Sequence, residues 1–478
     1  MSADGDDNND GLTPETAWQS MGKVLMELSW GEEKVVKPGD AIFFRRGDIF
    51  RLDEWALSVT LDQLTISAYG EGDKPIITAS SENGSGEEKW SLIYEDESGK
   101  KIWQYYRDMR DVSMIVMNNG EVITDRVYEF WNGDGYVSCE AVDWCMHSDK
   151  GVELKDRLYS PEESLVEDMT IISRPVRYHS TDFNQSGPLY LRCDRGNPGE
   201  LYESIEFCEF QTTGLIYLAE GADRIVLDNI SFRCNGNSYI KSNTGNEYGW
   251  WDYENTVVQN CEFAYGGGCV TSYEVWEGGP VVVAQGDGVY TVVKNSTLRN
   301  NYFHDSISTT TTYEYDLSET RISGGYYHVL DNVMVNTMGI RLDNTSDSLK
   351  YLDSVIIHGN HVWNTGRMDR GMYIYSEGAF VLMPACYGEY IIEDNVVYGT
   401  ENGHPMNALM DVHFYDYEYF NQYTRPIMGN NIYVQYRGRN WGDFDMQMEN
   451  TWSIDDPELL AKVEKYFGDT TSQFYVIQ

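Results

Sequence analysis

A loose repeat that begins near residue 201 constrains this chain more than any other feature of its sequence. Each repeat has a short run rich in β-branched residues, usually an Asn, and then a second short alternating run, as in IVLDNISFRC, STLRNNYFHDS and YIIEDNVVYGTENG. The repeated Asn residues are Asn229, Asn260, Asn301, Asn332, Asn360, Asn395 and Asn431, at spacings of 31, 41, 31, 28, 35 and 36 residues. Uneven spacing is typical of solenoids, which accommodate extra residues in surface loops.

The residue types favour strands. Val, Ile, Tyr and Thr suit a pleated, half-buried surface. Asn adopts left-handed turns, and stacked Asn side chains can bond to one another along the axis of a stack. No helical period persists through this region, which argues against a helical solenoid. We therefore predict an all-β fold, a single-stranded right-handed parallel β-helix, with a β-sandwich as the structural alternative.

Both ends of the chain have the features of helical caps, which a solenoid needs to cover its terminal turns. Thr13-Pro14-Glu15 predicts a helix start, and an apolar face follows at Ala17, Met21, Val24, Leu25 and Leu28. Near the other end, Asp456-Pro457 predicts a second helix with Leu459, Leu460, Val463 and Phe467 on one face, ended by Gly468. We expect an acidic leader and cap over 1–40, first rungs with long insertions over 41–200, the main β-helix over 201–450 and a helix–strand cap over 451–478.

Several segments resemble a known family. NNDGLTPETAWQSM, KPGDAIFFRRGDIFR and ISAYGEGDKPII resemble the start of secreted β-helix carbohydrate-active enzymes of the pectate-lyase-like superfold. IWQYYRDMRDVSMIVMNNGEVI and GPLYLRCDRGNPGELYESIEF resemble the stretch before the main helix in β-helix glycosidases such as the lacto-N-biosidase and fucosidase types. The resemblance implies a secreted or cell-surface bacterial protein whose signal peptide is absent from this sequence. It does not identify the reaction, because the fold hosts lyases, hydrolases, epimerases and binding proteins.

The net charge narrows the classes of partner that the protein is expected to bind. The formal net charge of −42 repels nucleic acids, anionic membranes and, more weakly, anionic glycans, whereas neutral glycans are tolerated best. No stretch has the length and apolarity of a membrane span. Asp6, Asn8, Asp10 and Gly11 match half of a calcium loop, but Ala17 stands where the bidentate acid is expected. We expect a monomer with a carbohydrate substrate and without a cofactor, calcium being the one alternative.

Three late strands carry the candidate site. In GIRLD, GMYIYSE and NALMDVHF, alternation places Ile340, Ile374 and Met410 inside the β-helix. The same alternation leaves Arg341, Asp343, Tyr373, Tyr375, Glu377, Asp411 and His413 on the outer face. An Arg, aromatic rings and carboxylates in one strip fit a sugar ligand.

Carboxylates are the candidate catalytic groups, because glycoside hydrolysis uses one protonated and one ionised carboxyl group. Neighbouring rungs place such groups about 5 Å apart, near the retaining spacing, and two rungs give about 10 Å, the upper edge of the inverting range. The candidates are Asp343, Asp369, Glu377, Asp411 and Asp416. Asp343 and Asp411 are expected two rungs apart, with Asp369 and Glu377 on the rung between.

Two loops are expected to add substrate contacts. WNTGRMDRG, residues 363–371, holds Trp363 as a stacking platform and Arg370 to orient hydroxyl groups. ENGHPMN places His404 near the same side. The sequence predicts a glycoside hydrolase of neutral oligosaccharides or polysaccharides. A uronate-specific polysaccharide lyase and a non-catalytic glycan-binding or adhesin solenoid are the alternatives.

Overall fold

The computed structural model describes most of the chain. The described residues are 1–31, 34–52, 56–127, 129–131, 136–138, 160–175, 186–210, 214–219, 221–236, 238–242, 255–267, 269–276, 279–285, 289–290, 295–306, 310–312, 326–337, 340–342, 352–365, 380–382, 386–399, 408–412, 426–444 and 451–478. Their secondary structure is predominantly strand, in mostly parallel sheets.

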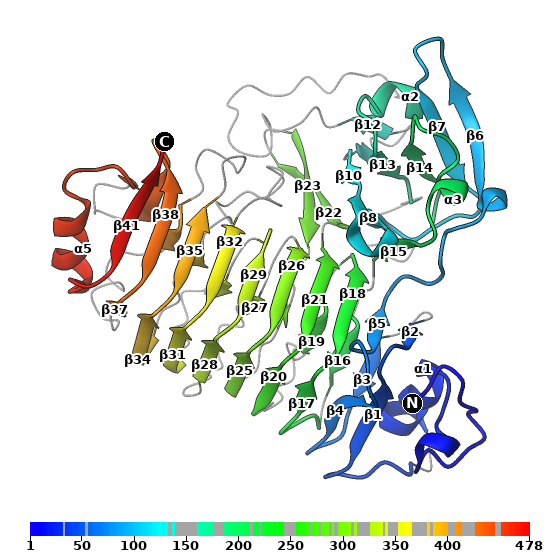
Figure 1. Cartoon of the computed structure of the whole chain (residues 1–478), viewed down its shortest axis with the longest axis horizontal. Coiled ribbons are helices and arrows are strands. Elements are labelled where there is room, and N and C mark those ends of the chain that lie inside the picture. Colours follow the sequence, from blue (N-terminus) through cyan, green and yellow to red (C-terminus); the bar gives the residue numbers. More distant parts are fainter. Residues whose placement is uncertain are drawn as a thin grey trace.

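Three long sheets, which we call A, B and C, make up most of the structure, and the strands lie side by side along its length (Figure 1). Sheet A contains, in order, β1 (Ala41–Arg45), β4 (Thr65–Tyr69), β17 (Val226–Asp228), β20 (Thr256–Gln259), β25 (Asn295–Arg299), β28 (Tyr326–Leu330), β31 (Leu352–His358), β34 (Cys386–Glu393) and β37 (Ile427–Gly429). All pairings within sheet A are parallel.

Sheet B follows sheet A along the chain. It contains β41 (Gln473–Ile477), β38 (Ile432–Tyr436), β35 (Val396–Gly399), β32 (His361–Thr365), β29 (Val333–Val335), β26 (Tyr302–Ser306), β21 (Glu262–Gly266), β18 (Ser231–Asn235), β15 (Ile205–Glu209), β8 (Val112–Met117) and β9 (Val122–Ile123), with β5 (Ile76–Thr78) and β2 (Ile49–Arg51) beside β18. Its pairings are parallel except where β8 joins β15 and β9.

Sheet C closes each turn of the chain. It contains β3 (Leu57–Val59), β16 (Ile216–Leu218), β19 (Ile240–Ser242), β24 (Val289–Tyr290), β27 (Thr310–Thr312), β30 (Ile340–Leu342), β33 (Val381–Leu382), β36 (Met410–Val412), β39 (Asn440–Phe444) and β40 (Thr451–Ser453). One strand from each of the three sheets, in chain order, makes what we call a coil, as in β28, β29 and β30. The segment KPGDAIFFRRGDIFR, residues 37–51, contains β1 and β2, and ISAYGEGDKPII, residues 66–77, covers most of β4 and β5.

Residues between β5 and β15 build a separate lobe near one end (Figure 1). Its five-stranded sheet orders β10 (Asp125–Arg126), β13 (Thr170–Ser173), β14 (Leu189–Arg192), β7 (Lys101–Tyr105) and β6 (Trp90–Glu95), and its helices are η3 (Glu87–Lys89), η4 (Asn118–Gly120), α2 (Pro161–Ser164) and α3 (Pro198–Leu201). Trp90, Tyr105 and Ile171 belong to a core cluster of this lobe. Two hairpins complete the strands: β11 (Glu129–Trp131) with β12 (Tyr136–Ser138), and β22 (Cys269–Trp276) with β23 (Gly279–Gln285).

Helical segments lie at both ends of the stack, as predicted. The N-terminal segment is divided into η1 (Pro14–Thr16), α1 (Met21–Leu25) and a π-helical turn, η2 (Met26–Trp30), and Ser20 rather than Thr13 caps α1. At the other end α5 (Leu459–Phe467) is ended by Gly468 in the left-handed conformation. Leu459, Val463 and Phe467 are buried, but the prediction for Leu460 is wrong, since it is 62% exposed. Among the described residues no helix is long and apolar enough to cross a membrane.

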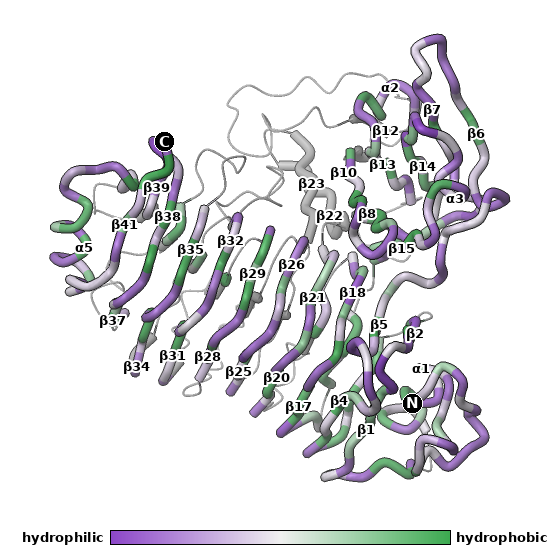
Figure 2. The backbone as a smooth tube through the Cα atoms, in the orientation of Figure 1, coloured by the Kyte–Doolittle hydropathy of each residue, from purple (hydrophilic) through white to green (hydrophobic). Residues whose placement is uncertain are grey.

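A buried ladder of Asn side chains runs along the turns between sheets A and B, where the chain is hydrophilic (Figure 2). The Oδ1 atom of Asn360 accepts from the backbone N and the Nδ2 of Asn332, both at 3.0 Å. Its Nδ2 atom donates to Val329 O at 2.9 Å and to Asn395 Oδ1 at 3.0 Å. Asn332 and Asn395 repeat this pattern, Asn301 repeats its donor bonds, and Asn431 ends the series, with Nδ2 donating to Ile392 O and the backbone N donating to Ser472 Oγ. Every bond of this kind joins one coil to the next.

The first two repeated Asn residues do not belong to this ladder. Asn229 and Asn260 have φ of 64° and 54° and stand at the left-handed position that Asn300, Asp331, Gly359, Asp394 and Asn430 occupy in the later turns. The ladder position itself is taken by the next residue, Cys261, whose backbone N donates to Asn301 Oδ1 at 2.9 Å. Both positions of the turn favour Asn for different reasons, so the letter alone could not separate them.

The ladder predicts that Asn360→Ala lowers the free energy of unfolding by about 2–5 kcal/mol, because buried partners on both neighbouring coils lose their bonds. Asn295→Ala is the matched control. Its half-buried side chain makes two longer bonds, at 3.2 and 3.3 Å, so about 1 kcal/mol is expected. Urea denaturation of both variants measures the difference, and an equal loss from the two would contradict the ladder's role.

Candidate functional site

Strand register lines up one residue from each of nine strands of sheet C in a single column. Tyr217 is half-buried between buried Ile216 and Leu218, and Ser58 stands likewise between Leu57 and Val59. Strand register extends this column through Ser58, Tyr217, Lys241, Tyr290, Thr311, Arg341, Leu382, Asp411 and Asp443. It carries the positions at which the sequence predicts a substrate site.

Two of the predicted residues share this column. Arg341 pairs with Leu382, and Leu382 pairs with Asp411, so Arg341 and Asp411 stand two strands apart. Their neighbours Ile340 and Met410 are buried, as predicted. The structure adds a residue that sequence reasoning missed: Asp443 of β39 is in register with Asp411 on the adjacent strand. The segment NWGDFD contains the signal, but its register depends on the turn before β39.

The predicted strand between Arg341 and Asp411 is wrong. The segment GMYIYSE was expected to stack there, whereas β33 lies further along the chain, at Val381–Leu382. Phe380, which is fully buried, places it: the backbone N of Ile340 bonds to Phe380 O at 2.8 Å, and that of Phe380 to Leu409 O at 2.7 Å. Both segments alternate apolar residues, so periodicity could not choose between them.

Most other predicted site residues lie outside the described residues. These are Asp343, Asp369, Glu377 and Asp416 among the carboxylates, and Arg370, Tyr373, Tyr375, His404 and His413 among the binding residues. The sequence also allows Cys139 and Cys145 to pair, and both lie outside the described residues. Their roles remain predictions.

Trp363 belongs to a strand rather than to the expected loop over 363–371. It lies in β32 of sheet B and is 45% exposed. Its ring stacks on that of Tyr398 in β35, with 4.0 Å between ring centroids and 5° between planes. Parallel strands in register place the two rings one above the other, which leaves each ring one face not covered by its partner.

Sheet B also carries a charged cluster around His304. Nε2 of His304 lies 3.1 Å from Glu262 Oε1, and Nδ1 lies 3.0 Å from Asp305 Oδ2. The other carboxylate oxygen of Glu262 accepts from Ser231 Oγ and, at 2.8 Å, from an Nη atom of Arg233. Both ring nitrogens of His304 are therefore engaged, and the ring is held between two carboxylates.

The cluster fixes the ionisation of its members. Burial alone would raise the pKa of Glu262, but the bonds from His304, Arg233 and Ser231 outweigh it and lower the pKa to about 2. Burial opposes protonation of His304, but the bonds to Asp305 and Glu262 outweigh it and raise its pKa above 6.5. A carboxylate that stays ionised at ordinary pH cannot donate a proton, so Glu262 does not suit the role of a general acid.

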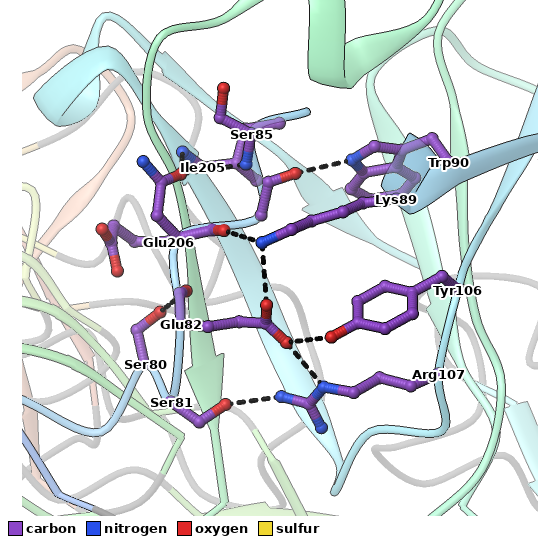
Figure 3. A network of polar contacts seen from close by, with 12 residues as sticks. Ser80, Ser81, Glu82, Ser85, Lys89, Trp90, Tyr106, Arg107, Ile205 and Glu206 are labelled. Carbon is purple, nitrogen blue, oxygen red and sulfur yellow. Dashed lines mark hydrogen bonds and ion pairs between the residues drawn. The ribbon is translucent and has the colours of Figure 1, made fainter. Parts of the chain in front are cut away.

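A second carboxylate network surrounds Glu82, in the segment that leads from β5 into the lobe (Figure 3). Glu82 accepts from Lys89 Nζ at 2.8 Å, Arg107 Nε at 2.7 Å and Tyr106 OH at 3.0 Å. Burial would raise the pKa of Glu82, but these donors lower it to about 2. Arg107 also donates to Ser81 Oγ at 2.7 Å. This network joins residues that follow β5 to residues that flank the two ends of the β6–β7 hairpin, and the three donors on the Glu82 carboxylate indicate a structural role.

Within the described ranges, no three His, Cys, Asp or Glu side chains gather in a way that could hold a metal ion. The half-matching calcium loop is bonded internally. Asp6 Oδ1 accepts from the backbone and side chain of Asn8, at 2.9 and 2.8 Å, and Asp10 Oδ1 accepts from Thr16 Oγ1 at 2.6 Å.

Comparisons with known proteins give only remote similarity. No protein-family model matches the chain, and no curated protein sequence matches it. Solved structures that resemble it over most of its length include the following three. A glycoside hydrolase shares 10% identity at a TM-score of 0.48, covering 92% of this chain and 94% of its own. The complex of XylC with xylose shares 11% at a TM-score of 0.34, covering 99% and 82%. The GH136 lacto-N-biosidase from Eubacterium ramulus shares 10% at a TM-score of 0.33, covering 100% and 67%.

His304 predicts a specific pH dependence of stability. Its pKa is raised in the folded state, so its stabilising charge is present below its unfolded pKa and is lost as pH rises through the folded value. We expect His304→Asn to flatten the decline in the free energy of unfolding as pH rises above about 6.5, the ordinary pKa of His, measured by urea denaturation.

His328→Asn is the matched control. Burial lowers the pKa of His328, so its effect has the opposite sign: stability is lost as pH falls, and the alkaline decline should persist in the variant. An alkaline decline that is the same in wild type and His304→Asn would show that the cluster does not carry it.

Proposed function

We propose that the protein is a glycoside hydrolase of neutral oligosaccharides or polysaccharides, folded as a right-handed parallel β-helix, with its catalytic carboxylates on the outer face of sheet C. One observation carries the proposal: Asp411 and Asp443 are register partners on adjacent parallel strands. Parallel register places both residues on one face of sheet C, opposite to the face of Met410, which precedes Asp411 and is fully buried.

The spacing fits a retaining reaction. Adjacent strands lie about 4.8 Å apart, and retaining glycosidases hold their two carboxyl groups about 5–5.5 Å apart. One carboxylate would attack the anomeric carbon and form a glycosyl–enzyme bond as the leaving oxygen takes a proton from the other. That second group would then deprotonate the water that breaks the bond. Two carboxyl groups this close favour a state in which one holds a proton.

The rest of the column suits a sugar. Arg341, two strands from Asp411, supplies a donor for hydroxyl groups, and Tyr217, Tyr290 and Thr311 continue the polar line. The net charge of −42 favours neutral over anionic glycans. Asp343, Asp369, Glu377 and Asp416, which lie outside the described residues, are the alternative candidates should Asp411 or Asp443 prove not to be catalytic. We also propose that the protein acts outside the cell as a monomer and without a cofactor.

We predict that Asp411→Asn and Asp443→Asn each lower the rate of hydrolysis by at least about 100-fold without changing the unfolding midpoint, because each removes a group that moves a proton or forms a bond. Reducing-sugar release from a panel of neutral glycans measures the rate. Asp331→Asn is the control: it makes the same chemical change at an exposed left-handed turn, where Asn is equally well accepted.

The product distinguishes the alternatives. NMR of the first product should show the anomeric configuration of the substrate. Inversion would exclude the adjacent pair and point to carboxylates two strands apart. Unsaturated product from polygalacturonate, detected by its ultraviolet absorbance, would identify a lyase. Glycan binding with neither kind of cleavage would identify a non-catalytic solenoid.

A further inference from the structure

Sheet B has an outward strip in which two valines stand between strands that carry larger side chains. Register places Val333 between Tyr302 and His361. It places Val335 between His304 and Trp363. The strand β29 thus carries two short apolar side chains, and the strands on both sides of it carry aromatic or imidazole rings.

The strand β29 is open to solvent on its outward side. Val333 is 41% exposed and Val335 is half-buried, whereas the inward neighbour Met334 is fully buried. Tyr302 and Trp363, on the flanking strands, are 40% and 45% exposed. Large apolar groups at this level of exposure in one contiguous strip are typical of a ligand surface rather than of scattered surface residues.

Trp363 offers a ring face toward the valines. One face of its indole is covered by Tyr398, 4.0 Å away, and the register neighbour on its other side is Val335. A valine is too short to cover an indole. On the opposite flank, the bonds of His304 to Glu262 and Asp305 hold its ring in place beside Tyr302, with 4.5 Å between centroids.

Polar groups border the strip where its strands end. Nδ2 of Asn336 donates to Asp305 Oδ1 at 2.8 Å, and Nδ2 of Asn364 donates to Asn336 Oδ1 at 3.0 Å. All three residues have positive φ and form a second polar line along the axis, less buried than the ladder. An apolar floor with a ring face on one side and amide and carboxylate groups at its end matches the two kinds of surface of a sugar ring.

We propose that this strip, made of Tyr302, His304, Val333, Val335 and Trp363, binds a pyranose ring of a neutral glycan, its apolar face against Trp363 and its hydroxyls toward Asp305, Asn336 and Asn364. The inference rests on the proposed function only for the class of ligand. The chain runs from Val335 to Arg341 in six residues, at most about 20 Å, so one glycan chain can contact both the strip and the outer column of sheet C.

Two variants test the strip from opposite sides. Trp363→Ala removes the ring face, and Val335→Phe fills the floor while adding an aromatic ring. Tyr475→Ala is the matched control, because Tyr475 is 51% exposed in the same register column but its neighbour Val434 is only 7% exposed. All are made in the Asp411→Asn background, so that hydrolysis does not consume the probe, and thermal unfolding confirms that each variant folds.

Binding is measured on an array of neutral oligosaccharides with polygalacturonate as the anionic comparison, and then by calorimetry with the neutral glycan bound most strongly. We expect both strip variants to weaken binding at least tenfold and Tyr475→Ala to leave it unchanged. Binding retained in Val335→Phe, or lost equally in Tyr475→Ala, overturns the strip as a site, as does an array without neutral glycan binding. Strip-dependent binding in a protein that hydrolyses nothing would refute the proposed reaction and leave the strip standing.

Discussion

The structure depends on amide groups that are buried yet bonded on every side. Each ladder Asn, from Asn301 to Asn431, accepts through Oδ1 from the coil before it and donates through Nδ2 to a backbone carbonyl of that coil. Each one before Asn431 also donates to Oδ1 of the next ladder Asn, and the backbone N of Asn431 donates to Ser472 Oγ. A buried amide without partners costs more free energy than a bonded one contributes. The ladder is therefore stable in only one register of each coil on the next. Stacked rings inside the coils follow the same register: Phe232, Phe263 and Phe303 lie 5.2 and 4.8 Å apart in near-parallel planes.

Because the register is fixed, residues that are far apart in the sequence become neighbours in columns that run across the strands. Asp411 and Asp443 are 32 residues apart in the sequence and neighbours in sheet C, while Val335 and Trp363 are 28 residues apart and neighbours in sheet B. Sheet B contains permanent ion pairs: Glu262 pairs with Arg233 and His304 and stays ionised. We therefore propose that proton transfer takes place at sheet C and that the neighbouring strip of sheet B serves binding.

Much of the architecture could be predicted from the sequence. The β-branched runs, the repeated Asn and the capping motifs depend on local preferences, which a sequence states directly. What failed depends on register. The sequence repeat aligns Asn229 and Asn260 with the ladder Asn residues, whereas both stand one position earlier, at the left-handed residue of the turn. Asn suits both positions, so the repeat does not separate them. The strand before Asp411 was placed on Tyr373 rather than on Leu382, because only Phe380's bonds to neighbouring coils distinguish two similar alternations. Asp443 escapes sequence reasoning because its register depends on the turn before β39. The prediction for Leu460 is wrong because helical spacing does not show where the packed face of the helix ends.

The most direct test of this account is to identify the carboxylate that forms the glycosyl–enzyme bond. An activated 2-deoxy-2-fluoro glycoside of a sugar that the protein hydrolyses traps this intermediate, and mass spectrometry of the digested protein locates the label. The in-register column predicts a label on Asp411 or Asp443 and none after substitution of the labelled residue by Asn. A label on a carboxylate outside sheet C's outer column would contradict the account.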